Sequence, residues 1–314
     1  MTSNTIVLEG HTITEEDRAA LQRICHLYLS SGNELENILH KEGTDEFQQM
    51  LGVGAYTRKL LGPHCKAIIT ETARGLFACD PEDYGVGWDI RRDGAYGERL
   101  LKSLSRVLSP SSNVLVVGAH VGTIAIPLAS MCGYVAAIEP SPHNFRLLEM
   151  NIRLNNITNC GIFNVAANDK EESLKFLLNR ANSGGSKRKP VNDHYIYSYD
   201  KPEEVLVPAV PLDKFFERRD FELILMDIEG SEYFALKGMQ QILQHTRVLI
   251  MEFVPHHLRN ISGVTVADLL DQIKGFSLLR IPSLDKKGGP AEFASLLNHM
   301  YERDVSDDGI IFQK

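Results

Sequence analysis

The sequence is poor in features that would direct the chain to a membrane, an oxidising compartment or a zinc site. Its 314 residues include only five cysteines, which are widely spaced and form no Cys-x-x-Cys pair, so we expect reduced thiols and no zinc. No apolar run approaches the roughly 20 residues of a membrane span. The N-terminus lacks the basic and apolar regions of a signal peptide. We therefore expect a soluble, cytoplasmic protein without a membrane partner.

An excess of basic residues is also lacking. Lysine and arginine number 33 against 41 acidic residues, for a formal net charge of −8. Proteins that grip nucleic acids usually display a concentrated basic face. The charge balance therefore disfavours a nucleic-acid partner and favours a small-molecule substrate.

The chain divides into two predicted regions. Residues 1–62 are expected to form a helical segment, with a helix from Thr14 to about Ser30 that Thr14 caps. This segment would serve as a packing cap or as the contact between copies in a homo-oligomer. Residues 63–314 are expected to form one α/β domain, because buried strands and helices alternate along them.

The alternation predicts the elements of the domain. Continuous aliphatic runs predict buried parallel strands over residues 114–117, 134–139, 223–226 and 248–253. Helices are expected over residues 124–131, 142–154, 233–243 and 264–273. Ser141 should cap the second of these helices, with Pro142 at its first position. Segments 276–281 and 309–312 are candidates for closing strands at the C-terminal side of the sheet.

One stretch is rich in glycine, serine and basic residues. Residues 181–190 read Ala-Asn-Ser-Gly-Gly-Ser-Lys-Arg-Lys-Pro, which predicts a mobile, solvated loop that could cover a substrate. Tyr195, Tyr197 and Tyr199 follow at alternate positions and would share one face of a strand.

The strand over residues 114–117 runs into a turn that contains Gly118 and Gly122, and Glu139 ends the next strand. Glycines let backbone amides approach a ligand, and an acid at this spacing binds ribose hydroxyls. A dinucleotide-binding turn also needs a middle glycine to admit the pyrophosphate, but His120 takes that place. The turn therefore favours S-adenosylmethionine, which has no phosphate, over a nicotinamide cofactor.

A second acidic motif follows the strand over residues 223–226. Asp227 lies directly after the strand, where open α/β sheets hold their ligands. Glu229 and Glu232 lie at the start of the following helix, where negative charge is favoured. Asp227 and Glu252 could supply metal ligands, but no ligand spacing demands a metal ion.

These motifs, in this order, resemble the FkbM-type methyltransferases. The resemblance covers the chain from about Lys66 onward, is strongest over residues 113–253, and does not reach the N-terminal segment. It is carried by residues 139–145, 151–155, 212–213, 227–232, 236–238, 251–253 and 308–312.

The resemblance implies a Rossmann-like class I methyltransferase fold, mostly parallel with an antiparallel closing strand, and S-adenosylmethionine as cofactor. It implies methylation of a hydroxyl group on a sugar or secondary metabolite. The candidate cofactor-binding residues are Glu98, Gly118, Ala119, His120, Gly122, Glu139, Pro140, Asn168 and Asp227.

The chain departs from the family pattern at two positions. Val116 replaces an aspartate that orients the methionine part of the cofactor, and His120 replaces an asparagine. Glu98 resembles a family acid ahead of the first strand and would take over part of this work.

The candidate catalytic residues are Asp227, His256 with its neighbour His257, and His120. Each could remove a proton from a hydroxyl acceptor. An amine acceptor would need no strong base. Transfer to an amine therefore stays open, as does a binding or regulatory protein that keeps the fold without turnover, an alternative that the missing aspartate motivates.

Overall fold

The computed structural model describes residue 54 and residues 57–314. The predicted helix from Thr14 to Ser30, and most of the predicted segment 1–62, lie outside these residues.

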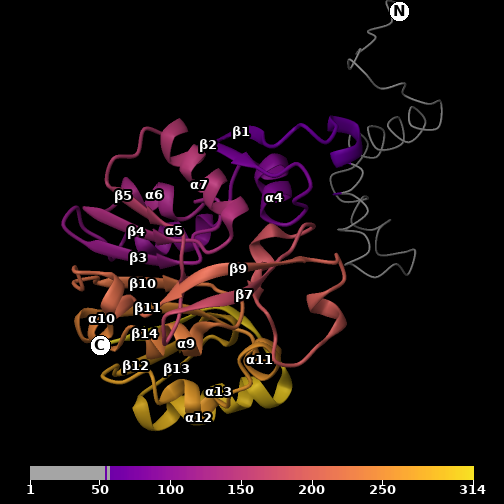
Figure 1. Cartoon of the computed structure of the whole chain (residues 1–314). Coiled ribbons are helices and arrows are strands. Elements are labelled where there is room, and N and C mark those ends of the chain that lie inside the picture. The colour runs from indigo at the N-terminus through magenta and orange to yellow at the C-terminus, as the bar shows by residue number, and fades with distance from the viewer. Residues whose placement is uncertain (1–53, 55–56) are drawn as a thin grey trace, which may run out of the picture. The chain divides into compact units, whose positions relative to one another are not determined.

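A sheet of eight strands forms the centre of the domain, in the order β13-β12-β14-β11-β10-β3-β4-β5 (Figure 1). Its five parallel strands are β3 (Asn113–Val117), β4 (Tyr134–Ile138), β5 (Cys160–Phe163), β10 (Leu223–Met226) and β11 (Val248–Phe253). β14 (Asp307–Gln313) closes this part antiparallel to β11, and β12 (Leu278–Ile281) and β13 (Lys286–Gly288) continue the edge. The predicted fold class, mostly parallel with an antiparallel closing strand, is confirmed.

Alternate residues of the parallel strands pack on opposite faces of the sheet, because successive side chains of a strand point in opposite directions. Val114 and Val116 of β3 join the apolar cluster that includes α5 (Glu98–Leu104), α6 (Ala125–Ala129) and part of α7 (Pro142–Leu154). Leu115 and Val117 join the cluster on the other face. The helices of that face are α8 (Leu212–Phe215), α9 (Glu232–Lys237), α10 (Gln240–His245), α12 (Val266–Leu270) and α13 (Pro290–Arg303).

Local signals set the bounds of some helices and tertiary contacts those of others. α7 begins as predicted: the Ser141 hydroxyl accepts a hydrogen bond from the Asn144 amide at 3.3 Å, with Pro142 in the first turn. The single helix predicted over residues 233–243 is wrong, because α9 ends at Lys237 and α10 begins at Gln240. Gly238 separates them, and a Cβ there would lie 1.9 Å from the Asn168 carbonyl oxygen.

A second sheet of four strands, in the order β6-β9-β7-β8, was not predicted. Its strands are β6 (Ala166–Ala167), β7 (Glu172–Leu178), β8 (Lys187–Arg188) and β9 (Glu203–Val210). Leu174, Phe176 and Val207 form its apolar core. The strands β7 and β9 cross the front of the large sheet in Figure 1.

The prediction of a mobile, solvated loop over residues 181–190 is wrong. Ala181, Ser183, Gly185 and Lys187 are buried, a short 3-10 turn spans Ser183–Gly185, and Lys187–Arg188 pairs with β7. The tyrosine strand is wrong as well. Tyr195–Tyr197 forms a 3-10 turn, whose start is capped by the His194 ring, which accepts a hydrogen bond from the Ile196 amide.

The remaining elements pack outside the central sheet or connect its strands. The strands β1 (Ile68–Thr72) and β2 (Gly75–Cys79) form an antiparallel hairpin, which packs with α4 (Val86–Asp93) against α6 and α7. After β11 the chain forms α11 (Pro255–His257) and a π-helical turn over Leu258–Ser262, and a 3-10 turn spans Pro282–Leu284.

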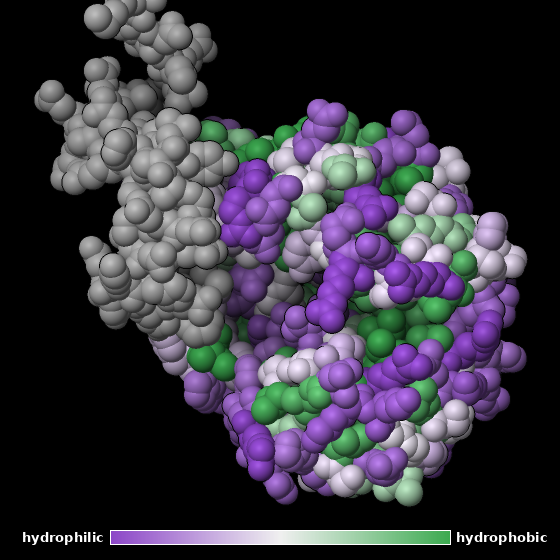
Figure 2. All heavy atoms as spheres, turned by 180° about the vertical axis from the view of Figure 1, so that it is seen from behind, coloured by the Kyte–Doolittle hydropathy of each residue, from purple (hydrophilic) through white to green (hydrophobic). Residues whose placement is uncertain are grey.

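Hydrophilic residues cover most of the face seen in Figure 2, and apolar residues lie between them in small groups. Within the described part of the chain, no helix combines the length and the apolar character needed to cross a membrane.

Candidate functional site

A cavity of about 230 Å³ lies where β3, β4, β10 and β11 end. The chain leaves β3 toward β4 and β5 on one side and returns to β10 on the other. Open α/β sheets bind ligands at such a reversal of strand order, outside the carboxyl ends of the strands. Six of the predicted site residues line this cavity: Gly118, Ala119, His120, Glu139, Pro140 and Asp227.

The two glycines of the turn after β3 have different roles. Gly118 has a φ of +90°, and a Cβ there would lie 1.8 Å from the Asp227 carbonyl oxygen, so only glycine lets β3 and β10 end side by side. Gly122 has a φ of +93° but does not line the cavity. A Cβ at this position would lie 2.7 Å from Leu148 Cδ1, so Gly122 lets the turn pack against α7.

Glu139 is held by the turn that it faces. Its Oε2 accepts a hydrogen bond from the His120 amide at 2.8 Å, and its Oε1 accepts one from the Ser141 amide at 2.9 Å. Burial raises the pKa of Glu139 to about 7, against the lowering effect of these two backbone hydrogen bonds. The side chain is therefore fixed in position, with its charge balanced near neutral pH.

His120 adopts a left-handed backbone conformation, with a φ of +51°. Asparagine and histidine occur there more often than most residues, which accounts for histidine at a position where the family has asparagine. Its Nε2 lies 2.7 Å from Ser183 Oγ, and that hydroxyl donates to Asp83 Oδ2 at 2.9 Å. The hydrogen of the ring is therefore on Nε2.

The other nitrogen of His120 has no partner. Burial lowers the pKa of His120, so the ring is neutral. Its Nδ1 is a buried acceptor without a hydrogen bond among the described residues. Since buried acceptors are nearly always paired, a ligand donor is a suitable partner for this atom.

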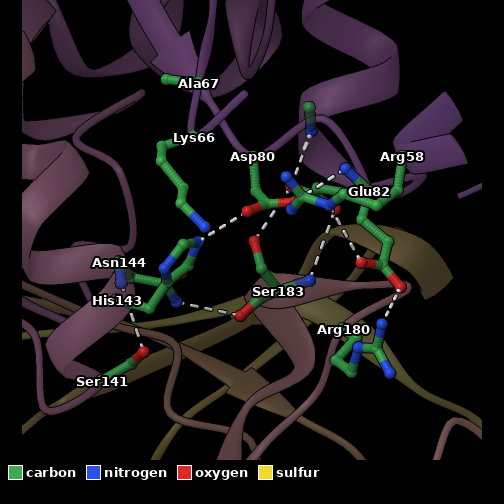
Figure 3. A network of polar contacts seen from close by, with 12 residues as sticks. Arg58, Lys66, Ala67, Asp80, Glu82, Ser141, His143, Asn144, Arg180 and Ser183 are labelled. Atoms are coloured by element: carbon green, nitrogen blue, oxygen red, sulfur yellow. Dashed lines mark hydrogen bonds and ion pairs between the residues drawn. The ribbon is translucent and has the colours of Figure 1, made fainter. Parts of the chain in front are cut away.

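A network of polar contacts holds the wall of the cavity that residues 180–186 form (Figure 3). The Asn144 side-chain amide donates to the Ser183 carbonyl oxygen at 3.0 Å, and Arg180 pairs with Glu82 at 2.7 Å. Arg58 pairs with Asp80 at 2.6 Å and extends the network. Because its polar groups have these partners, the glycine- and serine-rich segment is ordered, and Asn182, Gly184 and Ser186 line the cavity.

The opposite side of the cavity is acidic. Asp227 follows β10 and lines the cavity. Protein surrounds its side chain, but solvent reaches it through the cavity. Burial, together with the nearby Glu229, Glu232 and Asp308, raises the pKa of Asp227 to about 8. Glu232 accepts hydrogen bonds from the Ile228 and Gly230 amides, and burial raises its pKa to about 7.

Glu229 also has a left-handed backbone, with a φ of +53°, and such conformations in residues other than glycine concentrate at functional sites. Its Oε2 lies 3.4 Å from Lys187 Nζ and 3.5 Å from His257 Nε2. Burial favours the neutral carboxyl group, but Lys187 and His257 outweigh it and lower the pKa of Glu229. Burial lowers the pKa of His257 to about 4 and raises that of Glu252.

Besides Gly122, three predicted site residues do not line the cavity. Glu98 is on the surface, where it pairs with Arg74 at 2.8 Å. The buried Asn168 bonds to neighbours outside the cavity, among them the Lys170 carbonyl oxygen at 2.9 Å. His256 Nδ1 lies 2.9 Å from the Tyr197 hydroxyl.

Several residues of the site were missed because their partners are distant in sequence. Ser183 and Asp83 are 100 residues apart, and Lys187 and Glu229 are 42 apart. Lys187 belongs to a basic triplet, which in sequence resembles a solvated loop.

The fold and the site together define a Rossmann-like domain of the methyltransferase class. The central sheet closes with an antiparallel strand, a glycine turn follows β3, and acids lie at the ends of β4 and β10. The model of the Methyltransferase FkbM domain matches residues 117–277, just over half of the chain. The protein belongs to the FkbM methyltransferase family.

No curated protein matches the chain. Among solved structures, an rRNA methylase from Streptococcus thermophilus is 11% identical, with a TM-score of 0.39 over 69% of this chain and 94% of that one. TYW2 from M. jannaschii, in complex with AdoMet, is 13% identical, with a TM-score of 0.39 over 79% and 85%. A SAM-dependent methyltransferase from Agrobacterium tumefaciens is 12% identical, with a TM-score of 0.36 over 60% and 53%. These likenesses are too distant to indicate a substrate.

Proposed function

We propose that the protein transfers the methyl group of S-adenosylmethionine to a hydroxyl group of a small molecule, such as a sugar or secondary metabolite. The charge of the cavity lining carries this proposal. The described side chains that line the cavity include the carboxyl groups of Glu139, Asp227, Glu229 and Asp308, and none is a lysine or arginine. This lining suits a sulfonium cation, whereas the pyrophosphate of a dinucleotide would lack a cationic partner.

The residues at the end of β3 and β4 fit this cofactor. Glu139 would accept hydrogen bonds from the ribose hydroxyls, and the backbone of Gly118 and Ala119 would lie against the ligand. The unpaired Nδ1 of His120 would accept a hydrogen bond from an amino group. When bound, the cofactor supplies a methyl group activated by the sulfonium.

Asp227 is the proposed general base, because its carboxyl group borders the same cavity from the end of β10. It would accept the proton of the acceptor hydroxyl, and the walls of the cavity would align the acceptor with the methyl group. His120 is fixed by Ser183, and His256 lies outside the lining, so both are weaker candidates for this step.

Two experiments test the proposal. Titration calorimetry with S-adenosylmethionine and with NAD should show binding of the first only, and NAD binding without S-adenosylmethionine binding would contradict the proposal. A metabolite panel incubated with enzyme and cofactor should then yield a product that is heavier by one methyl group. Asp227→Asn should slow this transfer by about 100-fold or more, whereas the exposed Asp271→Asn should leave it unchanged.

Val116 supports a second candidate, a protein that binds the cofactor without turnover. Its apolar side chain lines the cavity at the position of the family aspartate. If Val116→Asp tightens binding of S-adenosylmethionine and neither form methylates any compound of the panel, this second function is favoured. Transfer that survives in Asp227→Asn would instead indicate an amine acceptor.

A further inference from the structure

Three potential metal ligands meet beside the cavity, and each comes from a different element. Glu229 lies in the turn after β10, Glu252 in β11 and His257 in α11. His257 Nε2 lies 3.5 Å from Glu229 Oε2, and its Nδ1 lies 3.6 Å from Glu252 Oε2. One ligand atom from each residue lies within 4.8 Å of the other two.

An unpaired atom points to a missing partner at this place. His257 is only 8% exposed, and its Nδ1 has no hydrogen-bond partner among the described residues. Glu252 Oε2 lies 3.6 Å from this nitrogen, which is beyond hydrogen-bond distance. Unpaired buried polar atoms are rare in native proteins, and an ion is one of the partners that explain them.

We propose that Glu229, Glu252 and His257 form a site for a divalent cation. Two carboxylates and one imidazole suit Mn²⁺ or Zn²⁺, since carboxylates bind hard cations and imidazole binds first-row transition metals. Ligand atoms about 2.1 Å from an ion in a tetrahedral site lie about 3.4 Å apart. The ligand atoms lie within 4.8 Å of one another, so rotation of the side chains must bring them closer by up to about 1.4 Å.

Lys187 competes with a bound cation. Its ammonium group lies 3.4 Å from Glu229 Oε2, and its side chain is only 7% exposed. A divalent ion on Glu229 must displace or repel this charge. Removal of the ammonium group should therefore strengthen metal binding. If Lys187 instead serves only to neutralise the carboxylates, its removal would destabilise the fold without any gain in metal affinity.

The metal site lies next to the place where the methyl acceptor would bind, because Glu229 lines the cavity together with the proposed base Asp227. A cation there would bind and polarise an acceptor oxygen. This use of the ion rests on the proposed function, but binding of the ion does not.

The experiment is a titration of the full chain with Mn²⁺ in the absence of cofactor, followed by the electron paramagnetic resonance signal of free Mn²⁺, with Zn²⁺ as competitor. We expect one saturable Mn²⁺ site, from which Zn²⁺ displaces Mn²⁺. His257→Ala and Glu252→Gln should each weaken binding by about tenfold or more. Asp308→Asn, which removes a neighbouring charge but no ligand, should change it by less than about threefold.

Lys187→Met should tighten Mn²⁺ binding by about threefold or more, since it removes the competing charge. Circular dichroism checks that each variant folds. If His257→Ala does not fold, the result for Glu252→Gln decides. The proposal is overturned if the wild-type chain binds neither ion, or if Asp308→Asn weakens binding as much as the ligand variants. Titration of the same sample with S-adenosylmethionine distinguishes this failure from failure of the proposed function.

Discussion

At the end of β4, both oxygens of Glu139 accept hydrogen bonds from backbone amides. Beyond β10, the carboxyl groups of Glu229 and Glu252 instead face the side chains of Lys187 and His257. The first end of the cavity is built from a turn, and the second from side chains that only the tertiary fold brings together. Backbone amides fix the first end, whereas the second end depends on which side chains the fold brings together.

The largest effect on stability is expected where the two ends of the cavity are in contact, at Gly118 and Asp227. Gly118→Ala would place a Cβ 1.8 Å from the Asp227 carbonyl oxygen in a left-handed conformation, so β3 and β10 could not end side by side. The free energy of unfolding should fall by about 4 kcal/mol or more. Chemical denaturation measures it.

Gly94→Ala is the matched control. Gly94 also has a positive φ, of +62°, but nothing lies within 4 Å of the added Cβ. Its cost should be about 1 kcal/mol, from the backbone conformation alone. Equal losses in the two variants would show that the contact between the ends does not constrain the fold.

The next test separates the ends. Glu139→Gln replaces one of the two acceptor oxygens by a donor that faces a backbone amide, so affinity for S-adenosylmethionine should fall by about 10- to 100-fold. Calorimetry measures this affinity, and the exposed Glu149→Gln on α7 is the control. Mn²⁺ binding at the other end should not respond, and a loss there would mean that the two ends are not independent.

The pH should act on the turn end through the same residue. With a pKa of about 7, Glu139 gains its charge as the pH rises, and the charged form is the better acceptor for ribose hydroxyls. The apparent Kd for S-adenosylmethionine should therefore fall by about tenfold between pH 6 and pH 8. A profile in Glu139→Gln as steep as that of the wild type would assign the effect to another group.

The smallest effect is expected for Glu98, which the family resemblance placed among the cofactor contacts. Its carboxylate pairs with Arg74 on the surface and does not line the cavity. Glu98→Gln should change the affinity for S-adenosylmethionine by less than about twofold, because an exposed ion pair is screened by solvent. A tenfold loss in the same titration would restore Glu98 to the site.

The sequence predicted the turn end well and the side-chain end poorly, for a physical reason. β3, β10, β11 and α7 follow from aliphatic runs and from the cap at Ser141, which are local signals. The small sheet and the ordered wall depend on contacts such as that of Ser183 with Asp83, 100 residues away. Local composition therefore suggested a mobile loop where the fold supplies partners for Ser183 and Ser186.

Opening of the ordered wall can be measured by proteolysis. Lys187, Arg188 and Lys189 are consecutive, and trypsin cuts after such residues. In the folded chain Lys187 is buried in strand β8, and the Arg188 guanidinium stacks 3.8 Å over the Phe234 ring. The rate of tryptic cleavage between these residues therefore measures how often the wall opens, and a ligand that enters the cavity and holds the wall in place should slow it.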